Sequence, residues 1–166
     1  MGRSGFPGAS GALSAPVVIV DVDAQRYGLP LASVERVERA VEITPLPNAP
    51  EIVIGVISIR DRVVPVFDFR RRLRIPSKEI ALEDQMVLAR AGARLVALLV
   101  DRVSAVVGAD EAARIAPEEV LPDLRHVAGI VKMEGGLVVI HDLDAFLSAE
   151  EEARLERALR ERPKTT

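Results

Sequence analysis

The sequence predicts a mostly all-β fold that ends in one helix. Branched aliphatic residues alternate with polar residues over short segments, which is the period of a half-buried strand. Turn signals recur between these segments, at Asp61, Ala91-Gly92 and Gly135-Gly136. No long amphipathic helix lies between the segments, as a parallel α/β sheet would require. Serial hairpins of this kind close into a barrel or a sandwich.

The first two strands form a hairpin. In "VVIVDVD" (17–23) valine alternates with aspartate, so one face is apolar and the other is acidic. A turn at 24–26 leads into a second strand around Tyr27. The next stretch, "LASVERVERAVEITPLP" (31–47), has a composition that suits a helix. Its β-branched residues and its prolines favour a short turn followed by a strand, and Asn48 then caps a brief helical turn that ends at Glu51.

Three further hairpins follow. Strands at 53–60 and 63–69 meet at Asp61, which tolerates the positive φ of a tight tip. Strands at 86–90 and 94–107 meet at Ala91-Gly92. The last pair meets at Gly135-Gly136, the strongest of these turn signals.

The one convincing helix is "SAEEEARLERALRER", which begins after Ser148. Ser148 and Glu151 have the spacing of a capping box. Leu155 and Leu159 form an apolar stripe that suits packing on the protein itself or on a partner. The chain is expected to fray from Arg162 onward. Two favourable ion pairs four residues apart follow the cap: Glu150 with Arg154, and Glu156 with Arg160.

Length and composition limit the class of protein. The 166 residues suit one domain, or two small subdomains that share a core. The chain has no cysteine, which excludes disulfides, thiolate zinc sites and a cysteine nucleophile, and indicates the cytosol. A net charge of -3 disfavours nucleic acid, because neutralisation of phosphates supplies most of that affinity.

The start of the chain does not have the pattern of a targeting segment. Residues 1–15 are rich in Gly, Ser, Ala and Pro and have no apolar segment, so they predict a disordered tail and no signal peptide. No apolar run approaches the ~20 residues that cross a bilayer. Direct insertion into a membrane is therefore not expected.

The sequence favours a binding module over an enzyme. Of the two histidines, His141 is followed by Asp142, and neighbouring side chains on a strand leave opposite faces, so the two cannot share a metal ion. The simpler role for Asp142 is to cap the turn that follows. A metal site or an active site centred on His141 and Asp144 stays open as an alternative. No metal and no cofactor are expected.

Asp68 and the arginines that follow it have two possible roles. Asp68 lies two residues before Arg70, so an ion pair at a barrel edge is expected, and a lone acid/base carboxylate is the alternative. The cluster could also mark an anionic partner such as RNA, but exposed aromatic residues that would stack on bases are missing. A solvated face is the preferred interpretation. The cluster consists of Arg70, Arg71, Arg72 and Arg74.

The stretch from Tyr27 to Leu73 resembles the CheW family, the coupling proteins of bacterial chemosensory arrays. The resemblance is carried by "YGL", by the link "PLPNAPEIVIG", and by the hairpin pattern G-x-x-x-x-R-x-x-V-x-P-V-x-D-x-R between Gly55 and Arg70. Further on, "LLVDRVSAVV" and "GGLVVIHDLDAFL" resemble the second half of the same domain. The match spans residues 16–147, and the helix and frayed end occupy 148–166.

The resemblance implies two linked five-stranded SH3-like β-barrels without catalytic activity. It also implies a protein that bridges a CheA-type histidine kinase and the cytoplasmic tip of a chemoreceptor at a membrane-associated array. The kinase would meet the outer barrel surface and the strand edges. The residues implied for a receptor groove between the barrels are Leu31, Val34, Arg36, Gly55, Ser58, Arg60, Met86 and Leu99.

Within this resemblance Arg60 has a defined expected role. It would lie on the Ser58 face of its strand and point toward the groove, while the neighbouring isoleucines fill the core. An arginine fork there could pair with carboxylates of a helical receptor tip.

The chain departs from the family pattern at two positions. Arg36 stands where the family often has an acidic residue, and Asp61 stands where glycine usually follows the arginine. These departures imply a divergent adaptor that matches a particular receptor or kinase. The alternative is a regulatory module that binds a kinase or another cytosolic protein without a receptor.

Overall fold

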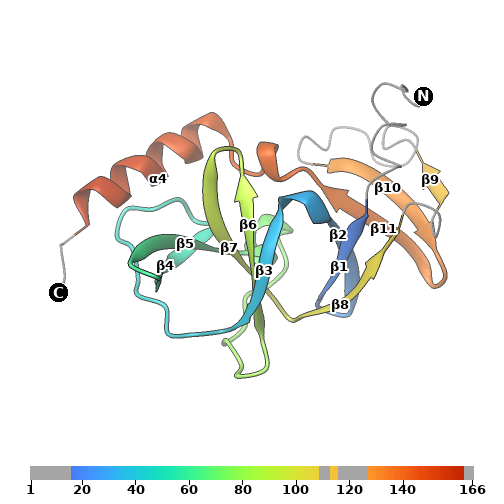
Figure 1. Ribbon diagram of the computed structural model, residues 1–166. Helices are drawn as coiled ribbons and strands as arrows, with labels where there is room; N and C mark the ends of the chain where they lie inside the picture. Colours follow the sequence, from blue (N-terminus) through green and yellow to red (C-terminus); the bar gives the residue numbers. More distant parts are fainter. Residues whose placement is uncertain (1–15, 109–112, 116–126, 163–166) are drawn as a thin grey trace.

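The computed structural model describes residues 16–108, 113–115 and 127–162. The predicted tail at 1–15, the last four residues and His126 lie outside this part of the chain. The described residues form two β-sheets side by side, with a long helix lying over one of them (Figure 1). No helix in the described part is long and apolar enough to span a membrane.

The five-stranded sheet is continuous in sequence. Its spatial order is β3-β6-β7-β5-β4, so β3 and β4 are its outer strands. An isolated bridge between Thr44 and Val56 brings the chain that follows β3 against β4 and closes this subdomain. The strands are β3 (Val34–Arg39), β4 (Val53–Ile59), β5 (Arg62–Asp68), β6 (Gln85–Ala91) and β7 (Arg94–Val100).

The six-stranded sheet is discontinuous in sequence. The chain forms two of its strands, leaves to build the whole five-stranded sheet, and then returns to add the other four. Its spatial order is β8-β1-β2-β11-β10-β9. The strands are β1 (Val17–Val22), β2 (Gln25–Pro30), β8 (Arg102–Val107), β9 (Ala113–Ile115), β10 (Val127–Met133) and β11 (Gly136–His141).

The mostly all-β prediction with two subdomains is confirmed, with differences in detail. One sheet has six strands because β9 adds to the edge of β10. The strand expected at 94–107 is interrupted at Asp101, where the chain passes from one sheet to the other.

The short helices differ in part from expectation. The helical turn predicted from Asn48 to Glu51 is wrong, because Asn48 has a positive φ of 69° and no residue of this segment is helical. Phe69 begins a helical turn instead of ending a strand. The helices are η1 (Leu31–Ser33), α2 (Phe69–Arg72), η3 (Leu143–Ala145) and α4 (Ala149–Glu161).

One apolar cluster joins both sheets and α4. Val20 and Leu29 from the six-stranded sheet pack in the same cluster as Phe67 and Val96 from the five-stranded sheet. Leu155 of α4 is fully buried in it. The apolar stripe of the helix therefore packs on the protein itself, which selects between the two predicted roles.

The capping box of α4 forms as predicted, but its ion pairs differ. Ser148 accepts a hydrogen bond from the backbone of Glu151, and the Glu151 side chain accepts one from the backbone of Ser148. Glu156 forms an ion pair with Arg94 of β7 rather than with Arg160. The helix is thus tied to the sheet by side chains as well as by its apolar face.

Candidate protein-binding surface

The structure separates the eight predicted groove residues by burial. Leu31, Arg36, Ser58 and Arg60 are exposed, and Val34 is half-buried. All five belong to the five-stranded subdomain or to the turn that leads into it. We call these five residues the receptor face, after the role that the resemblance implies for them.

The other three residues lie inside the barrel. Met86 is 0% exposed and Leu99 is 8% exposed, and both pack in the interior cluster that includes Val66. Gly55 is buried, and a Cβ at this position would lie 2.3 Å from the carbonyl oxygen of Thr44. These three residues shape the barrel beneath the surface and do not line an open groove in this structure.

Arg60 lies in the hairpin tip and not on a strand. Arg60 and Asp61 have φ values of 49° and 67°, so both central residues of the turn between β4 and β5 are left-handed. This geometry is that of the primed turns that match the twist of a hairpin. The Arg60 side chain is exposed at the tip, and Ile59 beside it is only half-buried.

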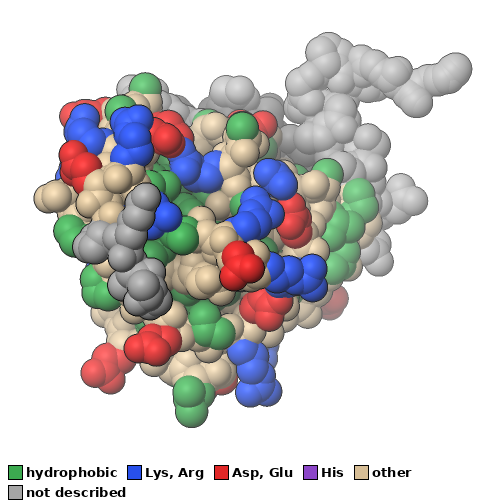
Figure 2. All heavy atoms as spheres, turned by 60° about the vertical axis from the view of Figure 1, so that its left-hand side comes forward, with side chains coloured by type: hydrophobic (Ala, Val, Ile, Leu, Met, Phe, Trp, Pro, Cys, Tyr) green, Lys and Arg blue, Asp and Glu red, His purple; other side chains and the backbone are tan. Residues whose placement is uncertain are grey.

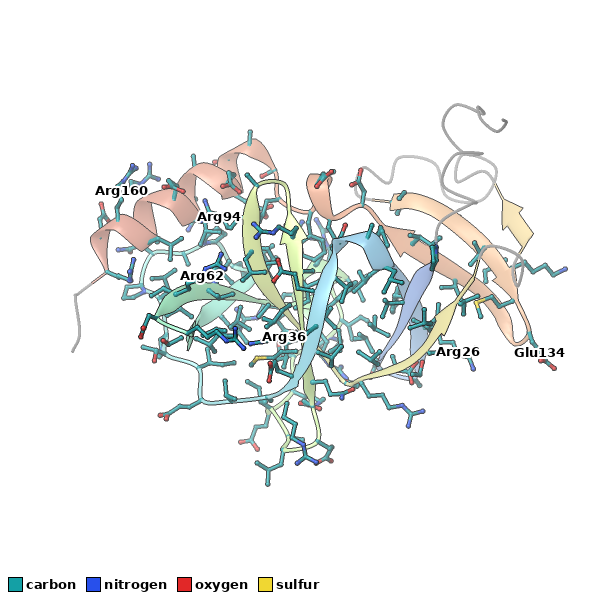
Figure 3. All side chains as sticks on the ribbon, in the orientation of Figure 1. Arg26, Arg36, Arg62, Arg94, Glu134 and Arg160 are labelled. Carbon is teal, nitrogen blue, oxygen red and sulfur yellow. The ribbon has the colours of Figure 1, made fainter. Side chains whose placement is uncertain are left out.

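Strand β3 carries the remaining charged member of the receptor face. Arg36 forms an ion pair with Glu38 on the same strand, with 2.6 Å between Nε and Oε2. Glu35 is paired with Arg90 of β6 at 3.1 Å. Arg36, Arg62 and Arg94 belong to the five-stranded subdomain, whereas Arg26 lies on β2 and Glu134 in the turn between β10 and β11 (Figure 3).

Asp68 and Arg70 do not form the ion pair predicted from their spacing. The Asp68 carboxylate accepts a hydrogen bond from the backbone N–H of Arg70 and so caps α2. The Arg70 guanidinium instead pairs with Asp101 at 3.0 Å and with Asp23 at 3.4 Å. Asp101 lies between β7 and β8, and Asp23 lies between β1 and β2, so Arg70 links the two sheets.

Burial and charge shift the pKa of both residues. Burial raises the pKa of Asp68, although the Arg70 N–H and nearby cations act in the opposite direction. Burial alone would lower the pKa of the Arg70 guanidinium, but the carboxylates of Asp101 and Asp23 raise it above the usual value. Arg70 therefore stays charged and acts as a structural link.

The solvated face predicted for the arginine cluster is wrong for two of its members. Arg70 is buried, and the Arg72 side chain is only 16% exposed. Arg72 pairs with Glu151 of α4 at 2.8 Å, and its guanidinium lies 5.5 Å from the ring centre of Phe146. The arginine cluster thus holds the subdomains and the helix together, and of its four arginines only Arg74 is exposed.

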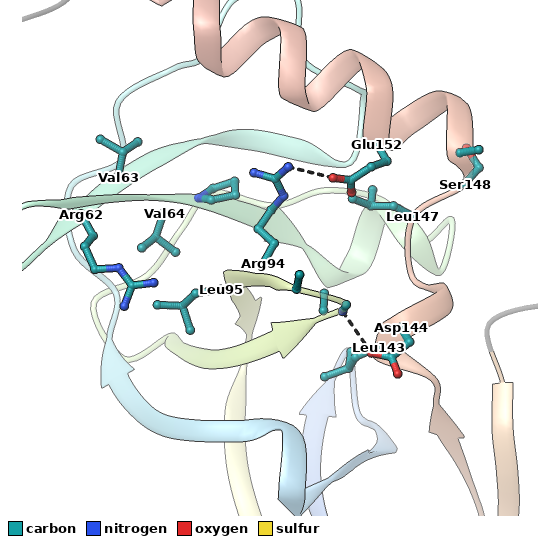
Figure 4. A pocket seen from close by; sticks show the side chains of 15 residues that line it. Arg62, Val63, Val64, Arg94, Leu95, Leu143, Asp144, Leu147, Ser148 and Glu152 are labelled. Carbon is teal, nitrogen blue, oxygen red and sulfur yellow. Dashed lines mark hydrogen bonds and ion pairs between the residues drawn. The ribbon is translucent and has the colours of Figure 1, made fainter.

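A cleft of about 570 Å³ lies where α4 begins, between β5, the tip joining β6 to β7, and the helix (Figure 4). Arg94 reaches across it to Glu152 at 2.7 Å, and the Gly92 N–H donates to Asp144 at 3.0 Å. None of the eight predicted groove residues lines this cleft. The role of Arg94 was missed because it depends on a helix more than fifty residues further along the chain.

The local cluster around His141 is structural. His141 is 2% exposed and its ring lies 5.0 Å from that of Phe69, inside a group of aromatic side chains. Asp142 accepts a hydrogen bond from the Asp144 N–H and caps η3, as predicted. Within the described residues, no group of three or more metal-ligating side chains could hold an ion.

Charge on the exterior does not form a patch of one sign on the face shown in Figure 2. Basic and acidic side chains are interspersed there, with apolar side chains between them. Exposed apolar residues of the described part include Leu31 on the receptor face, Val37 on β3 and Val106 on β8. The exposure of Val37 was not predicted, although the alternation of residues along β3 could have indicated it.

The chain matches a family model described as the CheW-like domain over residues 16–151. It is 30% identical to the protein "Chemotaxis protein CheW" of Bacillus subtilis (strain 168), covering 81% of this chain and 87% of that relative. The corresponding protein of Rhizobium meliloti (strain 1021) is 28% identical, with 76% and 83% covered. Among solved structures, the scaffolding protein TtCheW from Thermoanaerobacter tengcongensis aligns with a TM-score of 0.72 and 24% identity, covering 83% of this chain and 95% of that one.

Proposed function

The chain belongs to the CheW-like family, and from this premise we propose that it is a non-enzymatic adaptor that couples a chemoreceptor to a CheA-type histidine kinase. Its relatives are chemotaxis proteins, and the structural neighbour is a scaffolding protein. In this role it would work in the cytoplasm, at a membrane-associated array that it reaches through its partners.

The exposed receptor face is the observation that carries the proposal. Leu31 is 37% exposed and provides an apolar anchor, while Arg36 and Arg60 provide charged groups at either side of the same subdomain. The Thr44–Val56 bridge places the chain after β3 against β4. The strand that carries Arg36 therefore continues alongside the strand that leads to Arg60. Docking of a helix on such a surface uses apolar contacts for affinity and charged contacts for register.

The receptor tip would meet Arg60 first, because it lies at the end of a hairpin. An exposed guanidinium can form two parallel hydrogen bonds with a carboxylate on a helix. The buried members of the predicted groove would support the face by keeping the barrel closed. The kinase would bind strand edges elsewhere, and Val106, which is 58% exposed on the outer strand β8, suits such a contact.

The test is co-sedimentation of the purified chain with a receptor-tip fragment and with a CheA-type kinase fragment. Arg60→Glu is expected to weaken receptor binding about 10- to 100-fold and to leave kinase binding unchanged. Arg26→Glu, a charge reversal at an exposed position on the six-stranded sheet, is the matched control and should affect neither.

Two results would contradict the proposal at different levels. Receptor binding that is unchanged by Arg60→Glu would mean that the receptor face is assigned wrongly. Kinase binding without any receptor binding would favour the alternative, a regulatory module that engages a kinase alone. Failure to bind either partner would contradict the proposed adaptor function altogether.

A further inference from the structure

Strand β3 has a free edge. In the described part of the chain it pairs only with β6, and it is the outermost strand of its sheet. The Ala40 N–H donates to the Asp84 carbonyl oxygen at 3.0 Å on the β6 side. Because hydrogen-bonding directions alternate along an antiparallel strand, the N–H and C=O groups of Val37 and Arg39 point to the other side. This edge therefore offers backbone donors and acceptors to another strand.

Among the registers within two residues of a pairing centred on Val37, the charges along this edge complement themselves only in the centred one. When two copies of β3 are laid antiparallel with Val37 opposite Val37, Arg36 of each copy faces Glu38 of the other. A shift by one or two residues either way places two glutamates or two arginines opposite each other. Like charges directly opposite destabilise a strand pair, and opposite charges stabilise it.

We propose that β3 pairs with β3 of a second copy of this chain, around a twofold axis at Val37, so that two five-stranded sheets join into one. A contact of this kind is isologous, since the same residues contribute from both copies. Main-chain hydrogen bonds supply the attachment, and the charge pattern selects the register. Arg36, the departure from the family pattern, is the residue that makes the pattern self-complementary.

The side chains of β3 are available for this pairing. Val37 is 38% exposed and would be covered by its own copy. Arg36 and Glu38 have 41% and 40% exposed side chains and already pair within the strand. Two such pairs brought together form a square of alternating charges. The monomer loses little, because exposed ion pairs contribute little to stability.

The protection of this edge against strand pairing depends on charge. Outer strands commonly carry charged side chains, proline or bulges that prevent contact with another sheet. β3 has no proline, and it carries both charged residues of alternating sign, which repel a strand in the wrong register and attract a copy of itself in the centred one, and a bulge between Val34 and Arg36. The bulge limits regular pairing to the part of the strand that is centred on Val37.

This dimer goes beyond the adaptor function and requires neither receptor nor kinase. It covers Arg36, which belongs to the receptor face. A chain paired through β3 would therefore have part of that face occupied, so that dimer formation and receptor docking compete.

The test is sedimentation velocity of the purified full chain over a concentration series at low salt, with no partner present. The wild type is expected to shift from monomer to dimer as concentration rises. Arg36→Glu and Glu38→Arg should each weaken the dimer at least tenfold, because each places like charges opposite each other. A mixture of the two single variants should restore a dimer, since positions 36 and 38 are then both acidic in one chain and both basic in the other, and opposite charges face each other again.

Circular dichroism of each variant separates loss of pairing from loss of folding, and recovery in the mixture makes the same distinction independently. Three outcomes would overturn the proposal. They are a wild type that stays monomeric up to about 1 mM, an Arg36→Glu variant that dimerises like the wild type, and a mixture that remains monomeric.

Discussion

Single residues in this protein hold conformations that their neighbours in sequence do not explain. The tip between β4 and β5 places Arg60 and Asp61 at positive φ, and the tip between β1 and β2 does the same with Asp23 and Ala24. For a residue with a Cβ this region of φ costs about 1–2 kcal/mol, and only glycine avoids the cost. The twist of the hairpins requires these turns, so the surrounding sheets carry the strain.

Replacing Asp61 by glycine should therefore stabilise the protein. Asp61→Gly is expected to raise the free energy of unfolding by about 0.5–1 kcal/mol, because relief of the positive φ exceeds the entropy that glycine adds to the unfolded chain. Urea denaturation measures the change. Glu134→Gly, at another hairpin tip where the replaced residue is not left-handed, serves as the control and should give no gain. A urea midpoint for Asp61→Gly that is lower than that of the wild type would contradict the inferred strain at this hairpin tip.

Arg70 is a residue whose role depends on two distant segments, those of Asp23 and Asp101. Arg70→Ala should lower the free energy of unfolding by about 2–3 kcal/mol, since it removes one partner of a largely buried ion pair and leaves Asp101 without its counterion. Arg102→Ala is the matched control, because its pair with Asp21 is exposed and should be worth at most about 1 kcal/mol. Chemical denaturation measures the unfolding free energy of both variants. Equal losses for Arg70→Ala and Arg102→Ala would show that Arg70 does not link the sheets.

The elements of this fold are stabilised by partners in other elements more than by their own sequence. α4 has a strong N-cap, but its ion pairs reach β7 and α2 rather than the next turn of the helix. The side chain of Glu151 serves both purposes, because it completes the capping box and pairs with Arg72. The helix is thus positioned on the sheet by its first turn.

This pairing predicts a pH dependence that belongs to α4. Burial raises the pKa of Glu151, but the Ser148 N–H and Arg72 outweigh it, so the pKa lies below the ordinary value of 4.5. A lowered pKa means that the ionised carboxylate stabilises the folded state above that value, and that this stability is lost as pH falls through the folded pKa. Glu151→Gln should therefore cost about 1 kcal/mol at pH 7 and progressively less below pH 4.5.

Thermal unfolding between about pH 3 and 7 measures this difference for wild type and variant, with the acid range set by the unfolded carboxyl. Glu150→Gln is the control on the same helix, because Glu150 is exposed and forms no ion pair in the described part of the chain. A gap between wild type and Glu151→Gln that stays constant with pH would show that charge pairing with Arg72 contributes nothing.

At the scale of the molecule, the two sheets behave as one unit because they share a core. The largest cluster contains Val20 and Leu29 from one sheet, Phe67 and Val96 from the other, and Leu155 from α4. The chain also passes between the sheets twice within the described strands, before β3 and at Asp101. Neither sheet can lose its packing without exposing apolar surface of the other.

A single cooperative unfolding transition should follow from this arrangement. Hydrogen exchange followed by mass spectrometry should give the same maximum protection for peptides from β1 and β2 as for peptides from β6 and β7, within about 1 kcal/mol. Phe67→Ala, at the centre of the shared cluster, should lower the protection of both sheets together. A sheet that exchanges independently of the other would contradict the shared core.

Much of the fold follows from local pattern. Alternating valines predicted the strands, the turn residues predicted the tips, and Ser148 with Glu151 predicted the start of α4. These features depend on neighbours within a few residues, where side-chain direction and backbone preference act directly. The prediction of a helical turn at Asn48 was wrong because a residue that can cap a helix can also adopt positive φ. Only the surrounding chain selects between these two conformations.

The sequence by itself determined the order of strands along the chain, the helix at its end and the family to which the chain belongs. The tertiary structure alone decided that β1 and β2 belong with β8 to β11, that Arg70 joins the two sheets, and that Met86 and Leu99 lie inside the barrel. It also decided that β3 is an outer strand. These properties depend on which distant segments meet, and contact between distant segments is fixed by burial of the shared core and not by the spacing of residues along the chain.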